Sequence, residues 1–238
     1  TDATSGAVNL WLDAADANTM TLSGSLVTEW QDKSTTQLNA VPPSGQEPSL
    51  TTIDGFNAIR FTGSKRFFSA NQVTTRDWRN VFIVTKYEAG TTFTSIPTGY
   101  VSLFSSAIFG GSANGQGFYA TSGTNFFQAN SFLGGPFYLN AVQISPDLNN
   151  RVVLPQLNTS LGFISANATG AVAVGGYALG TLRDLASPYD GVICEVVSYG
   201  STLSTTDRQK MEGYLAWKWN LVSLLPSNHP YKNSRPTV

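Results

Sequence analysis

Apolar side chains recur at every second position in several short stretches of the chain, which is the spacing of a β-strand with one buried face. Residues 56–61 alternate in this way and follow the turn pair Asp54-Gly55. Residues 81–85 are instead a continuous β-branched and aromatic run, typical of a strand buried on both faces. Similar runs occupy residues 100–104, 117–120, 137–144, 171–174 and 192–199.

Clusters of Gly, Asn, Ser and Pro separate these runs, notably at residues 42–45, 110–115 and 134–136. Many short strands divided by turn residues are typical of a β-sandwich or jelly roll. No internal repeat and no long linker divides the chain, so we predict a single domain over residues 1–238. The chain opens on Thr1 without an apolar leader, and we therefore expect it to be excised or processed from a longer chain.

One segment near the end has helical spacing instead. Ser204 stands before it as an N-cap residue with Asp207 at the third helical position, a variant of the capping box. An apolar arc follows, made of Met211, Tyr214, Leu215, Trp217 and Leu221. The other side of the same helix carries Glu212, Ala216 and Asn220. We predict a helix of about three to four turns.

This helix needs a cover for its apolar arc, because amphipathic helices are stabilised mainly by packing. We predict that the arc, including Trp217, packs on the outer face of the sheet that contains residues 192–199. Gly213 has no side chain and is expected to let the tail approach the helix closely. Pro226 and Pro230 then end regular structure.

Charged residues make up only 12% of the chain, about half the usual ~25%, and the net charge is −1. This balance argues against electrostatic capture of nucleic acid. No run of 18 apolar residues is present, so no membrane insertion is expected. The single cysteine, Cys194, lies among valines and isoleucines, and we predict a small core residue rather than a reactive thiol.

Six stretches of the sequence are familiar in combination. They are 10–16 (LWLDAAD), 27–34 (VTEWQDKS), 55–63 (GFNAIRFTG), 191–197 (GVICEVV), 212–219 (EGYLAWKW) and 225–231 (LPSNHPY). Together they resemble the laminin-G-like jelly-roll domain of the concanavalin A-like lectin/glucanase superfamily. The likeness is to the kind seen in phages, large DNA viruses and marine bacterial surface proteins. It covers residues 8–85 and 170–232, whereas residues 90–165 match nothing comparable.

The resemblance implies an all-β fold, a two-sheet antiparallel jelly-roll sandwich of concanavalin A-like type with one C-terminal helix. It also implies an adhesive or glycan-binding module, although some members of the superfamily are polysaccharide hydrolases or lyases. Trp11, Trp30, Phe61, Phe82, Trp217 and Trp219 stand at family-like positions, and we expect them to pack in the core.

Catalytic chemistry finds little support in the residues. Glu195 is the best-placed acid in a strand, but no second acid follows on its face, as paired-carboxylate glucanases require. We predict that Glu195 is a structural acid bonded to a neighbouring loop or to the helix. His229 is the only imidazole and lies between prolines in the tail, where we expect it to be packed or solvated. We predict no enzyme activity and no cofactor.

Metal binding is not expected either. Asp13, Asp16 and Asn18 gather oxygen atoms, but their spacing does not fit a calcium loop, and Asx-turn or cap roles fit better. A weak calcium site near Asp13 and Asp16 stays open as an alternative.

Ligand contacts, if a glycan binds, should come from aromatic and amide side chains in loop-rich stretches, because sugar rings stack on aromatic faces. The candidates are Tyr100, Asn114, Tyr119, Asn125, Tyr138, Tyr177, Asp184 and Tyr189.

Three functions remain open from the sequence. We favour a non-enzymatic, lectin-like adhesion or structural module of a virion or cell surface, outside the cell, that binds a glycan. The first alternative is a capsid or fibre protein without a ligand, whose partners are neighbouring subunits. The second is a polysaccharide hydrolase or lyase.

Overall fold

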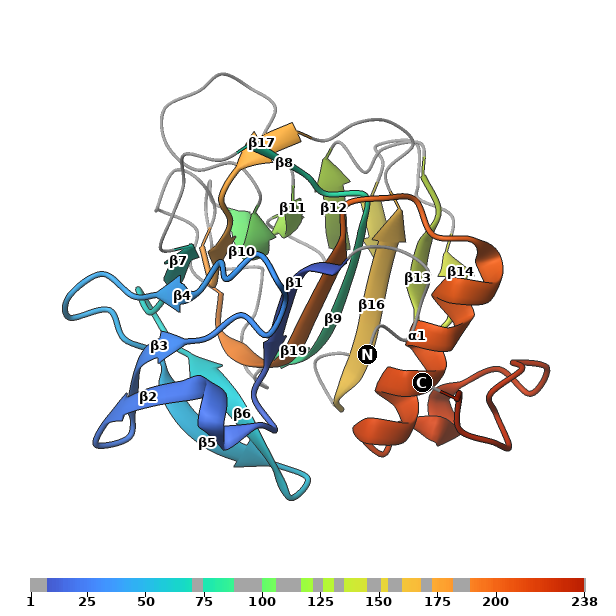
Figure 1. Cartoon of the computed structure of the whole chain (residues 1–238), viewed down its shortest axis with the longest axis horizontal. Coiled ribbons are helices and arrows are strands. Elements are labelled where there is room, and N and C mark those ends of the chain that lie inside the picture. Colours follow the sequence, from blue (N-terminus) through green and yellow to red (C-terminus); the bar gives the residue numbers. More distant parts are fainter. Residues whose placement is uncertain are drawn as a thin grey trace.

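The structure is a computed structural model. It describes residues 8–69, 75–87, 100–105, 117–121, 126–130, 135–144, 151–153, 160–167, 173–181 and 189–237. Within these ranges the fold is all-β with a single long helix near the C-terminus, as predicted (Figure 1).

In the described residues the helices are α1 (Thr205–Lys218) and two short 3-10 helices at Ala17–Thr19 and Val222–Leu224. The first strands are β1 (Val8–Asp13), β2 (Met20–Ser23), β3 (Leu26–Trp30), β4 (Ala40–Val41), β5 (Ser49–Ile53), β6 (Phe56–Phe61), β7 (Phe67–Ser69), β8 (Thr75–Asp77) and β9 (Asn80–Tyr87). The middle of the chain contributes β10 (Tyr100–Ser105), β11 (Gly117–Thr121), β12 (Phe126–Asn130), β13 (Phe137–Leu139), β14 (Val142–Ile144) and β15 (Arg151–Val153). The last strands are β16 (Gly162–Asn167), β17 (Ala173–Gly175), β18 (Ala178–Leu179) and β19 (Gly191–Tyr199).

Strand β19 organises the sheet. It pairs with β9 on one side, and on the other side with β6 along its first residues and β1 along its last. From β9 the pairing continues through β16 and β13 to β14. From β6 it continues through β5 to β3, and from β3 through β4, β7, β18, β10, β11 and β12 to β15.

The expected division into two separate sheets is therefore not confirmed. Seventeen of the described strands form one antiparallel network, and β8 and β17 form a small ribbon of their own. The physical reason is β6, which pairs with the start of β19 and also with β5, so that hydrogen bonding runs on without a break. The architecture is nevertheless sandwich-like, because the network encloses a large apolar core.

Tight turns shape two of the hairpins. Asp54 and Gly55 have φ values of 49° and 85°, which suit the primed turn that joins β5 and β6. Residues 137–144, predicted as one strand, are two strands, because Asn140 and Ala141 turn with φ values of 51° and 67°. The Asn140 side chain accepts a hydrogen bond from Phe163 N at 2.9 Å and so fixes this turn.

Two apolar cores lie on opposite faces of the central strands. Val81 and Ile83 of β9 face the inner core, and Phe82 and Val84 face an outer core under α1. The predicted burial of this strand on both faces is therefore confirmed. Cys194 is fully buried in the outer core, also as predicted.

Helix α1 covers this outer core (Figure 1). Ser204 caps it through a hydrogen bond from Asp207 N, as the sequence predicted. Met211 and Leu215 are buried, but the buried tryptophan is Trp219 rather than Trp217, which is only half-buried.

The buried face of the helix is rotated relative to the predicted arc, because Ala216 packs in the outer core with Met211 and Leu215. The prediction that Glu212 and Ala216 lie on the other side of the helix is therefore wrong. Glu212 and Ala216 are fully buried, with Glu212 bonded to Arg208 and to His229. His229 is thus a packed residue. A Cβ at Gly213 would lie 2.6 Å from Tyr231 Cβ, so this glycine does allow the close approach of the tail.

Candidate functional site

A β-bulge in β19 sets the direction of Glu195. The register with β9 pairs Ile193 with Thr85 and Glu195 with Val84, which leaves Cys194 as the extra residue. A bulge places consecutive residues on the same side of a strand and can re-aim a side chain. Glu195 therefore points to the outer face, toward α1, together with Cys194.

Four donors surround the Glu195 carboxylate, which has no exposure to solvent. Its Oε1 accepts from Trp11 Nε1 at 2.8 Å and from Tyr214 Oη at 2.9 Å. Its Oε2 accepts from Trp219 Nε1 at 2.5 Å and pairs with Lys218 Nζ at 2.9 Å. The prediction of a structural acid bonded to the helix is confirmed.

Lys218 joins Glu195 to a second carboxylate. Asp13 lies opposite Glu195 in the β1–β19 register, and its Oδ1 is 2.6 Å from Lys218 Nζ. The other oxygen of Asp13 pairs with Lys33 at 3.0 Å, and Lys33 reaches Asp16 at 2.9 Å. Three carboxylates and two ammonium groups thus alternate in one cluster, which we call the carboxylate–lysine cluster.

The cluster shifts the acidities of its members. Burial raises the pKa of Glu195, Lys218 opposes that shift, and Asp13 adds to it. Burial lowers the pKa of Lys33, but hydrogen bonds to Asp16 and Asp13 outweigh this and the pKa is raised overall. The hydrogen bond from Lys33 is the largest cause that lowers the pKa of Asp16.

Asp13 and Asp16 also hold the backbone locally, as their predicted Asx-turn and cap roles require. Asp13 accepts from Ala15 N at 3.1 Å, and Asp16 caps the first 3-10 helix through Asn18 N. The position between their side chains is taken by the Lys33 ammonium. Across the described part of the chain, no group of three or more His, Cys, Asp or Glu residues could hold a metal ion.

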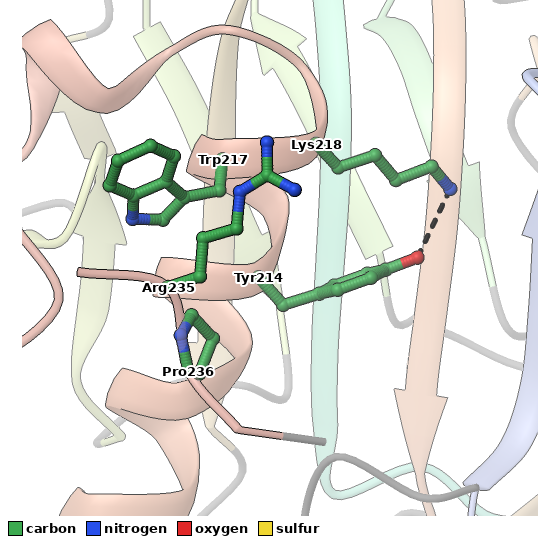
Figure 2. Close-up of a pocket in the computed structure, with 5 residues that line it drawn as sticks. All are labelled: Tyr214, Trp217, Lys218, Arg235 and Pro236. Carbon is green, nitrogen blue, oxygen red and sulfur yellow. Dashed lines mark hydrogen bonds between the residues drawn. The ribbon is translucent and has the colours of Figure 1, made fainter.

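A surface pocket of about 360 Å³ lies beside this cluster. Figure 2 shows its lining, which comes from the second half of α1 and from the tail. The lining residues are Tyr214, Trp217, Lys218, Arg235 and Pro236. Two aromatic rings and two cationic side chains therefore line one hollow, and Tyr214 and Lys218 belong to both the pocket and the cluster.

The pocket rings are held in place by their polar atoms. Trp217 Nε1 donates to Tyr231 O at 2.9 Å, which ties the indole to the returning tail. Tyr214 Oη donates to Glu195 Oε1 and accepts from Lys218 Nζ at 3.1 Å (Figure 2). The Arg235 guanidinium lies 5.4 Å from the centre of the Trp217 ring, within the ~6 Å range of a cation–π contact.

Among the predicted ligand residues, the structure describes the side chains of Tyr138, Tyr177 and Tyr189, and none of these three lines the pocket. Tyr177 and Tyr189 are fully buried in the inner core, and their hydroxyls donate to Leu38 O at 2.7 Å and Lys86 O at 2.9 Å. These two residues are core residues, and the expectation of a surface role is corrected here. Tyr138 is 8% exposed and lies under the Arg208 guanidinium, 3.9 Å from its ring centre.

The remaining candidates fall in the middle of the chain. Tyr100 and Tyr119 lie on the paired strands β10 and β11, of which the structure describes the backbone. Asn114, Asn125 and Asp184 lie outside the described residues.

The sequence did not predict the pocket, because the pattern assigns its residues to the apolar core or to the irregular tail. Tyr214 and Trp217 belong to the apolar arc of a helix, which normally signals burial. Arg235 follows a proline-rich stretch that gives no hint of where it returns. The nearest available signal was Gly213, which did predict that the tail lies on the helix.

No protein-family model matches the chain, and a search of curated proteins finds no match. The resemblance to laminin-G-like jelly rolls therefore stays a prediction. In the described residues no helix is long and apolar enough to cross a membrane.

Proposed function

We propose that this domain is a non-enzymatic, lectin-like module of a virion or cell surface, and that it binds carbohydrate in the pocket of Figure 2. The observation that carries the proposal is the composition of this pocket. Sugar-binding sites combine aromatic faces, on which sugar rings stack, with a few fixed polar groups. Tyr214 and Trp217 offer the rings, and the contacts to Glu195 and Tyr231 hold them in place.

The state of Glu195 supports a role without catalysis. A catalytic carboxyl group must reach the substrate and exchange a proton with it. Glu195 is fully buried and is surrounded by donors from β1 and from α1 with its C-cap residue. These contacts suit an acid that holds β1, β19 and α1 together.

The test is a glycan-array screen followed by calorimetric titration of the best ligand. Trp217→Ala removes the ring and should abolish binding, whereas Trp217→Phe keeps an aromatic face and should retain much of it. Because Trp217 is half-buried, the melting temperature of both variants is measured beside the titration. Binding that survives Trp217→Ala unchanged, or no glycan ligand at all, would overturn the proposal.

A further inference from the structure

The two cations of the pocket are not equivalent. The Lys218 ammonium lies 2.6 Å from Asp13 Oδ1 and 2.9 Å from Glu195 Oε2, so its charge is already compensated by two carboxylates. Its contribution to the pocket is therefore its hydrocarbon stem, in the manner of a lysine that covers an aromatic surface. A ligand gains little electrostatic attraction from this residue.

Arg235 is in a different state. It is exposed, and no carboxylate in the described part of the chain forms an ion pair with it. Its guanidinium faces the Trp217 ring and shares the pocket with Tyr214 (Figure 2). A guanidinium presents a planar fork of donors that matches the two oxygens of a carboxylate or sulfate.

We propose that the pocket selects a sugar that bears one negative charge, and that Arg235 is the residue that binds its carboxylate or sulfate group. This inference rests on the proposed function, because it names the class of sugar that the same pocket takes. The sugar ring would lie against Tyr214 and Trp217 with its anionic group directed to Arg235. In the part of the chain that the structure describes, Arg235 is the one cation of the pocket whose charge is not compensated, and it fits one anionic group on the bound sugar.

Charge-assisted hydrogen bonds to a guanidinium predict a clear preference. We expect an acidic sugar to bind about tenfold to a hundredfold more tightly than its neutral counterpart. Arg235→Gln should remove this preference, and Arg235→Lys should restore only part of it, because an ammonium group lacks the planar fork.

The probes are galactose oligosaccharides and oligogalacturonates of equal length, with a sulfated galactose oligosaccharide as a third arm, all titrated calorimetrically at one salt concentration. The uronate and sulfate arms distinguish the two sources of the anionic group. Lys65→Gln is the matched control, since it removes one positive charge at a site where Lys65 contacts the backbone oxygen of Gly45. It should leave the preference intact.

The results of these titrations bear separately on the role of Arg235 and on carbohydrate binding itself. A preference that Arg235→Gln abolishes and Lys65→Gln preserves supports the inference. Equal binding of acidic and neutral sugars overturns the inference but leaves the carbohydrate-binding proposal standing. A preference that both variants reduce equally shows general attraction to net charge, which also overturns the assignment to Arg235. If none of the three probes binds and no arrayed glycan binds, the proposed function itself is overturned.

Discussion

The Glu195 carboxylate is buried, and four donors directed at its two oxygen atoms take the place of water. Burying an acid costs several kcal/mol unless hydrogen bonds and an ion pair compensate for lost hydration. The bulge at Cys194 makes this compensation possible, because it turns Glu195 toward the side of the sheet where the donors lie.

Glu195→Gln should therefore destabilise the domain by about 3 kcal/mol. The amide nitrogen of glutamine would face donors, and at least one of the buried N–H groups would lose its acceptor. Denaturant unfolding at neutral pH measures the loss. Glu47→Gln is the control, because Glu47 accepts only from backbone near the surface. Equal midpoints for Glu195→Gln and the wild type would refute this account.

Lys33 should make stability sensitive to alkaline pH. Its pKa is raised in the folded state, so its contribution is fully present below the ordinary value of 10.5 and is lost as the pH rises through the raised pKa. The difference in unfolding free energy between the wild type and Lys33→Gln should thus shrink above pH 10.5.

Urea unfolding across that pH range measures this difference. Lys65→Gln should show no comparable change, because the Lys65 ammonium contacts a backbone oxygen rather than a carboxylate. A difference for Lys33→Gln that stays constant or grows with pH would contradict the assigned role of Lys33.

At the scale of the elements, the two tryptophans at the end of helix α1 differ in burial, and the helical spacing did not predict which of them is buried. Trp219 is 1% exposed, packs against Phe56 at 5.3 Å between ring centres and donates to Glu195. Trp219→Ala should cost about 3–5 kcal/mol. Trp217→Ala should cost distinctly less, because the half-buried Trp217 lies on the pocket side. Parallel denaturation curves compare the two, and an equal or reversed order would be inconsistent with this packing.

Strand and helix limits followed from the sequence wherever their signals are local. The alternation at 56–61 and the Ser204 cap involve neighbours along the chain, and both appear in the structure where expected. The split of residues 137–144 was missed because Asn140 and Ala141 adopt a left-handed turn inside an apolar run.

The surroundings of Glu195 could not be predicted in the same way. Its partner Trp11 lies 184 positions away, and no spacing rule connects them. The bulge is also a property of pairing with β9 and leaves no pattern within β19 itself. The sequence could predict that Glu195 contacts the helix, because β19 and α1 are close in sequence, but it could not predict which side chains are its partners.

For the whole molecule, removal of metal ions should have little effect. The carboxylates of Asp13 and Asp16 already share the Lys33 ammonium, and a calcium ion would have to displace it. Since a bound ion stabilises only the folded state, the melting temperature should be equal in EDTA and in calcium. A drop of many degrees in EDTA that calcium restores would instead reveal a site at these residues.

The carboxylate–lysine cluster also has a mechanical meaning. Lys218 at the end of α1 grips Asp13 of β1 and Glu195 of β19 at once. A force that pulls β1 and α1 apart therefore acts directly on these ionic contacts. Under such a load, the strain between β1, β19 and α1 is carried by three side chains, of which Asp13 and Glu195 are buried.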